Sequence, residues 1–156
     1  MLKEGLGRMA GKLAVMLLCL CLSVAALAGC GSDRLVEQSD AQMAAIVESI
    51  QLSVAEEGWT YTGYELLETD AEHDTATVAM AYDVDGDAKE LLKAHASEKP
   101  KDDSVYALAE NINVKATVAL SAYDKGNDAL GCSLLSTTWY VGDTEADQWI
   151  QEQNKS

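Results

Sequence analysis

Three aspartates at alternate positions form the pattern in this sequence that most suggests ligand chemistry. Asp83, Asp85 and Asp87 are separated by single residues, and spaced carboxylates are the oxygen ligands that calcium prefers. An EF-hand-type loop that begins at Asp83 would need glycine at its sixth position and glutamate at its twelfth. Here the glycine is Gly86, at the fourth position, and the twelfth residue is Ala94. Calcium is therefore a weak candidate, and the alternative is a strand-to-helix turn with an aspartate cap.

The histidines and cysteines do not form a metal-binding or nucleophile pattern. His73 lies in a polar turn, where we expect it to be solvated, whereas His95 lies on the apolar side of a predicted helix. Neither has a cysteine or histidine partner at zinc-ligand spacing. Cys132 alternates with Leu130 and Leu134, which predicts a buried, inert thiol. The sequence has no Gly-x-Ser-x-Gly elbow or glycine-rich phosphate loop, so we expect no catalytic residue and no cofactor, and no enzyme class is indicated.

Aromatic residues suggest one surface for binding. Trp59 and Tyr61 point to one side of a predicted strand, and Trp139 lies near the end of the last predicted strand. If those strands are neighbours, the rings would form an exposed platform for a glycan or for an envelope protein. The alternative is that the same rings belong to the ordinary hydrophobic core.

The overall charge limits the possible partners. The chain of 156 residues has 26 Asp+Glu against 11 Lys+Arg, which gives a net charge of −15. Such a surface repels phosphate groups, so we expect no nucleic-acid partner. Hydrophobic residues make up 48% of the chain, which excludes a wholly disordered protein, and the length suits one domain.

The first thirty residues have the composition of an export signal. Lys3, Arg8 and Lys12 precede an uncharged, mostly apolar run from residue 13 to residue 29. That run is short for a membrane-spanning helix, which needs about 20 residues. Its order of basic, apolar and small residues is typical of a secretory leader. An uncleaved signal anchor is the alternative.

The end of this leader, Leu27-Ala28-Gly29-Cys30, resembles the lipobox of bacterial lipoproteins. The resemblance implies that Cys30 receives a diacylglycerol thioether and that a signal peptidase cuts just before it. It therefore implies a cleaved leader over 1–29, a lipidated cysteine and short linker over 30–34, and an extracytoplasmic protein anchored to the bacterial cell membrane. Acyl chains contribute roughly 0.8 kcal/mol per buried methylene, and two chains make a stable anchor.

Removal of the leader would change the remaining chain in two ways. Three basic residues leave with it and only one acidic residue, Glu4, so the mature chain is more acidic than the precursor. Cys19 and Cys21 also leave, and Cys30 would be acylated, so we expect no intramolecular disulfide.

Residues 35–156 predict a single α+β domain. We expect a helix over 35–57, strands over 59–68 and 75–84, a helix over 88–96, strands over 112–123 and 130–141, and a short C-terminal helix. The first helix carries five apolar residues on one face: Met43, Ile46, Val47, Ile50 and Val54. Clean alternation predicts a four-stranded antiparallel sheet with helices on one face and the second helix between the two strand pairs. In element order only, this outline resembles cystatin-like and NTF2-like folds, which implies no activity.

These features predict a membrane-anchored envelope lipoprotein that acts as a non-enzymatic binding or interaction module. The membrane would be bound through the lipid on Cys30, and the further partner would be an envelope protein or a glycan. The alternative is a small-ligand pocket protein or an enzyme whose site lies inside the curve of the sheet.

Overall fold

The computed structural model of the chain describes residues 34–122 and 130–156. The predicted leader, Cys30 and residues 31–33 lie outside these ranges. In chain order the elements are η2 (Leu35–Glu37), α2 (Asp40–Val54), β1 (Trp59–Asp70), β2 (Thr75–Val84), α3 (Ala88–His95), η3 (Asp103–Leu108), β3 (Ile112–Ala122), β4 (Leu130–Val141), β5 (Thr144–Glu145) and α4 (Ala146–Lys155), where η marks a 3-10 helix. Within these ranges no helix is long and apolar enough to cross a membrane.

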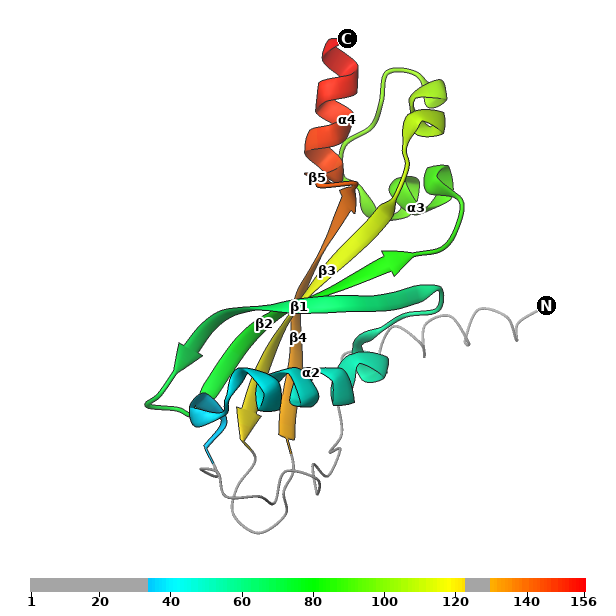
Figure 1. Ribbon diagram of the computed structural model, residues 1–156. Coiled ribbons are helices and arrows are strands. Elements are labelled where there is room, and N and C mark those ends of the chain that lie inside the picture. The colour runs from blue at the N-terminus through cyan, green and yellow to red at the C-terminus, as the bar shows by residue number, and fades with distance from the viewer. Residues whose placement is uncertain (1–33, 123–129) are drawn as a thin grey trace, which may run out of the picture.

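The strands form one antiparallel sheet in the order β1-β2-β3-β4-β5. The α+β class and the antiparallel sheet are confirmed, but the predicted count of four strands is wrong. Gly142 adopts a left-handed φ of 59°, and the chain turns there so that Thr144 pairs back with Val141 and forms β5. Figure 1 shows the strongly twisted sheet with α2 at one end and α3, η3 and α4 at the other.

The predicted helix over 35–57 is two separate elements, η2 and α2. Gln38, between them, has an extended ψ of 142° and breaks the helical path. Ser39 then begins α2 with a capping box, because its hydroxyl accepts from Gln42 N while the Gln42 side chain accepts from Ser39 N. At the other end Ala55 is extended and Gly58 has a φ of 84°. A strong local cap therefore set a boundary that hydrophobic periodicity alone did not reveal.

The core lies between the helices and one face of the sheet. All five predicted apolar residues of α2 are buried, as are alternate residues of β2 and β3, which confirms the predicted alternation. Those strand residues are Ala76, Val78, Met80 and Tyr82 on β2, and Ile112, Val114, Ala116, Val118 and Leu120 on β3. The residues between them point to the opposite face. There Thr77 and Thr117 are half-buried, Ala79 is buried and Lys115 is exposed.

Cys132 differs from its prediction. It is half-buried on β4 and takes part in a disulfide bond, so the expectation of a buried, inert thiol and the expectation of no intramolecular disulfide are both wrong. The other cysteines of the chain, Cys19, Cys21 and Cys30, lie outside the described residues. Alternation with Leu130 and Leu134 correctly placed the Cys132 side chain on the core face of β4, but alternation carries no information about covalent partners.

Candidate functional site

An aromatic cluster joins the first and fourth strands of the sheet. The ring centroids of Trp59 on β1 and Trp139 on β4 are 5.8 Å apart in an edge-to-face arrangement. Trp59 also lies 5.3 Å from Tyr82, and Tyr61 lies 5.7 Å from the same Tyr82 ring. These distances are typical of stabilising aromatic pairs. Of the three residues that the sequence singled out as a binding surface, Trp59 and Tyr61 therefore meet at Tyr82, and Trp139 joins the cluster through Trp59.

The ring contacts show how strongly the sheet curls. Strands β1 and β4 are separated by β2 and β3, and three spacings of about 4.8 Å would put them roughly 14 Å apart in a flat sheet. The sheet curves toward the core face, so that Trp59 and Trp139 meet there. The predicted condition that their strands be neighbours is not met. Trp139 is only 7% exposed, so it supports the cluster from inside while Trp59 and Tyr61 remain half-buried at its rim.

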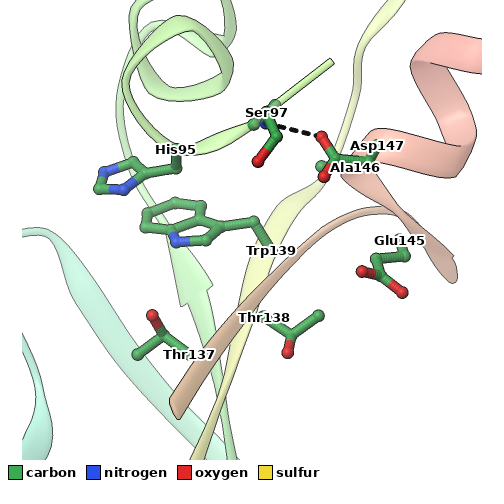
Figure 2. Close-up of a pocket in the computed structure, with 9 residues that line it drawn as sticks. His95, Ser97, Thr137, Thr138, Trp139, Glu145, Ala146 and Asp147 are labelled. Atoms are coloured by element: carbon green, nitrogen blue, oxygen red, sulfur yellow. Dashed lines mark hydrogen bonds between the residues drawn. The ribbon is translucent and has the colours of Figure 1, made fainter.

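His95 extends the cluster toward a small cavity. Its ring stacks on Trp139 with centroids 3.9 Å apart and planes 10° apart, as Figure 2 shows. Beside this stack lies a cavity of about 180 Å³, lined by His95, Ala96, Ser97, Thr137, Thr138, Trp139, Glu145, Ala146 and Asp147. Binding pockets for drug-sized ligands commonly span roughly 300–1,000 Å³, so this cavity would hold only a small group. The apolar pattern of the helix predicted the side on which His95 lies, but it did not predict the cavity.

Asp147 in the cavity wall has a structural role. Its Oδ1 accepts hydrogen bonds from the backbone N–H groups of Ser97, at 2.7 Å (dashed in Figure 2), and Glu98, at 2.9 Å. One turn further along α4, Gln151 donates to the Glu98 carboxylate at 3.2 Å. Asn154 then accepts from Lys101 N at 2.8 Å. These three side chains of α4 fasten the segment that follows α3, and so they fix the position of the cavity.

The hydrogen bonds accepted by Asp147 predict a difference in stability between two variants at this position. Replacing Asp147 with alanine would leave two backbone N–H groups without their acceptor, at a cost of about 1–3 kcal/mol. Asp147→Asn is the matched control, because its amide oxygen can accept from the same two groups. Urea denaturation should show a clearly lower midpoint for the alanine variant than for the asparagine variant. Equal losses in both variants would contradict a hydrogen-bonding role for this side chain.

The candidate calcium ligands are not brought together. Among residues 34–122 and 130–156 no group of three or more His, Cys, Asp or Glu side chains is arranged to hold a metal ion. Asp87 instead caps α3, since its carboxylate accepts from Glu90 N at 3.0 Å. Asp83 and Asp85 are exposed. The predicted strand-to-helix turn with a capping aspartate is confirmed.

His73 lies in the exposed turn where the sequence placed it, but it has a specific partner. Its Nδ1 lies 2.7 Å from Asp70 Oδ2, and its backbone N–H donates to Asp70 Oδ1 at 3.2 Å. These hydrogen bonds, the side-chain one first, lower the pKa of Asp70 from its ordinary value of 3.8. The contribution of this turn to stability is therefore present above about pH 3.8 and is lost as the pH falls through the lowered pKa.

The hydrogen bonds that hold residues 97–101 against α4 were not predicted from the sequence. The signal was available in part, because Asp147, Gln151 and Asn154 follow the i, i+4, i+7 spacing of one helix face. That spacing shows that the side chains share a face, whereas their partner segment lies about fifty residues earlier in the chain.

No protein-family model, curated protein or solved structure matches the chain.

Proposed function

We propose that the protein is an envelope lipoprotein, acylated at Cys30 and held at the extracytoplasmic side of the bacterial cell membrane. The order of basic residues, apolar run and lipobox supports this proposal. A lipid anchor at Cys30 would also orient the domain. The described chain starts at Arg34, which donates to the carbonyl of Ala71, while Val36 N donates to Asp74 Oδ1 at 3.1 Å.

These contacts attach the start of the domain to the turn between β1 and β2. Four residue steps separate Cys30 from Arg34, and such a linker spans at most roughly 14 Å. The β1–β2 turn would therefore lie next to the membrane. The end of the sheet that carries α3, η3 and α4 would point away from it (Figure 1).

We infer that the domain acts as a non-enzymatic interaction module. The observation that carries this proposal is a rigid aromatic rim on an edge strand. Trp59 and Tyr61 are half-buried on β1 and are held from behind by Tyr82, whose relative exposure is 0%, and by Trp139. Large aromatic side chains with fixed orientation are favoured at protein interfaces, because little conformational entropy is lost when they bind.

Crosslinking in the native envelope tests this function. A photoreactive residue at Leu67, which is 50% exposed on β1, should give a discrete adduct with an envelope protein. The matched control is the exposed Glu152 on α4, which lies at the opposite end of the sheet. Absence of a specific adduct from Leu67 and from every other exposed position tried would contradict an interaction module.

The second candidate is a small-ligand protein, and the cavity beside His95 supports it. The rings of Trp59, Tyr82 and Trp139 fill space on the curved face of the sheet, and the cavity lies against the last of these rings. Its small volume and the use of Asp147 in structural hydrogen bonds favour the interaction module. The finer outline, with a helix packed on a curled sheet as in cystatin-like or NTF2-like folds, is a proposal on element order alone and implies no activity.

A further inference from the structure

Charge is unevenly distributed along the chain. Residues 35–88, which form α2, β1 and β2, contain no lysine or arginine. They do contain many acidic residues: Glu37, Asp40, Glu48, Glu56, Glu57, Glu65, Glu68, Asp70, Glu72, Asp74, Asp83, Asp85 and Asp87. The part of the chain that forms α2, β1 and β2 is therefore strongly acidic, with Arg34 paired to Glu37 and Asp74 beside it, and a cationic partner would be attracted to it.

The outer edge of β1 belongs to this acidic part of the chain. Among the described residues, β1 pairs with β2 and with no other strand. An edge strand presents unpaired backbone N–H and C=O groups that can pair with an added strand. Near the middle of this edge, Leu66 and Leu67 are 45% and 50% exposed, and they are bracketed by the exposed carboxylates of Glu65 and Glu68. Exposed leucines on an unpaired edge are typical of a binding surface.

A half-exposed aromatic row continues the same edge. Trp59, Tyr61 and Tyr64 are partly buried against the core. Tyr61 and Tyr64 lie close enough that Tyr64, together with Glu48 of α2, contributes to raising the pKa of Tyr61, after the larger effect of burial. Tyr61, Tyr64 and Leu66 pair with core-face residues of β2, whereas Glu65 and Glu68 pair with Ala79 and Thr77 of the opposite face. One face of this edge is therefore apolar and the other is acidic.

A second copy of the chain does not suit this edge. Two copies of β1 would bring Glu65 and Glu68 of one chain near the same acidic residues of the other, and like charges disfavour such pairing. Like-charged side chains on an edge strand are a device that limits pairing between identical chains. A basic strand from a different protein matches both the acidic charge and the unpaired backbone of β1.

We propose that the edge of β1 binds an extended, cationic segment of an envelope protein by strand addition. This proposal rests on the interaction-module function proposed above and names its partner class. The backbone of the added segment would pair with the outer groups of β1. Its basic side chains would lie against Glu65 and Glu68, and its apolar side chains against Leu66 and the aromatic row.

A defined peptide pair tests the proposal on the full mature protein in detergent. The probe is a short peptide of alternating lysine and valine. The control peptide has the same charge but carries proline at alternate positions, which removes backbone donors. Hydrogen exchange should show slowed amides in β1 with the first peptide only. Protection of β4 instead of β1, or equal binding of the proline peptide, would overturn strand addition at this edge.

Charge reversal supplies the matched variants. The double variant Glu65→Lys/Glu68→Lys should weaken binding of the lysine-valine peptide roughly tenfold or more. The control is Glu110→Lys/Asp143→Lys, which changes net charge equally at two exposed positions away from β1. It should retain affinity within about a factor of two. Equal weakening in both variants would show attraction to net charge alone and would overturn the proposal.

Failure of this inference is distinguishable from failure of the proposed function. If envelope crosslinks form only at positions away from β1, the protein is still an interaction module but its partner does not use this edge. If the lysine-valine peptide protects β1 but no position crosslinks in the envelope, the edge accepts a basic strand, whereas an envelope protein as its occupant and the proposed function are both contradicted.

Discussion

Replacing Tyr82 with alanine is expected to lower the free energy of unfolding by about 3–5 kcal/mol, the usual range for removal of a large buried ring. Tyr82 has a relative exposure of 0%. Its ring contacts Trp59 and Tyr61, and its hydroxyl donates to the Gln51 carbonyl of α2 at 3.0 Å. The residue therefore links the aromatic cluster, the sheet and the first long helix.

Tyr82→Phe separates the ring from the hydroxyl. It should cost only about 1 kcal/mol, because the Gln51 carbonyl keeps a second hydrogen bond from Ala55 N at 3.0 Å. Chemical denaturation of the two variants at neutral pH measures the difference. If the phenylalanine variant were destabilised as much as the alanine variant, the central packing role assigned to the ring would be wrong.

The same pair of proteins predicts an alkaline effect. Burial, with a smaller effect of Tyr61, raises the pKa of Tyr82 well above its ordinary value of 10.0. Above that pH the unfolded chain can ionise this tyrosine while the folded chain holds it neutral, so wild-type stability should fall as the pH rises beyond about 10. In Tyr82→Phe this dependence should be weaker. An identical slope in both proteins would contradict a buried, neutral Tyr82.

Replacing Cys30 with alanine is expected to abolish acylation and normal maturation. The thioether requires the Cys30 sulfur, and the lipoprotein signal peptidase cuts before the modified cysteine. The variant should therefore fail to incorporate labelled palmitate and should keep residues 1–29. Cys132→Ala is the matched control, because it removes the disulfide-bonded cysteine of β4 and leaves the lipobox intact, so labelling should persist. A Cys30→Ala variant that matures and partitions with membranes like wild type would contradict the lipoprotein proposal.

Periodicity was a reliable guide where one face of an element is buried. The alternation through Val114, Ala116 and Val118 predicted β3 and its core face, because a strand repeats every two residues. The break at Gln38 was missed, since the apolar pattern on either side of it is helical and the capping box of Ser39 decides the boundary.

Contacts between residues far apart in the chain could not be predicted from the local pattern of apolar and polar residues. The meeting of Trp59 with Trp139 depends on the curl of a sheet whose strands β2 and β3 lie between them. Alternation predicts which side of a strand a ring occupies but not how far the sheet bends. The acidic stretch over 35–88, in contrast, can be read directly from the sequence. It suggested a binding surface only once the structure showed that, among the described residues, β1 is an edge strand of the sheet.

The most direct test of an anchored envelope module is the mass of the N-terminal peptide of the protein isolated from its native membrane. We predict a peptide that begins at Cys30 and carries a diacylglycerol thioether on its sulfur. A peptide that still contains the leader would contradict the account. So would a disulfide between Cys30 and Cys132, because one sulfur cannot hold both a thioether to lipid and a disulfide.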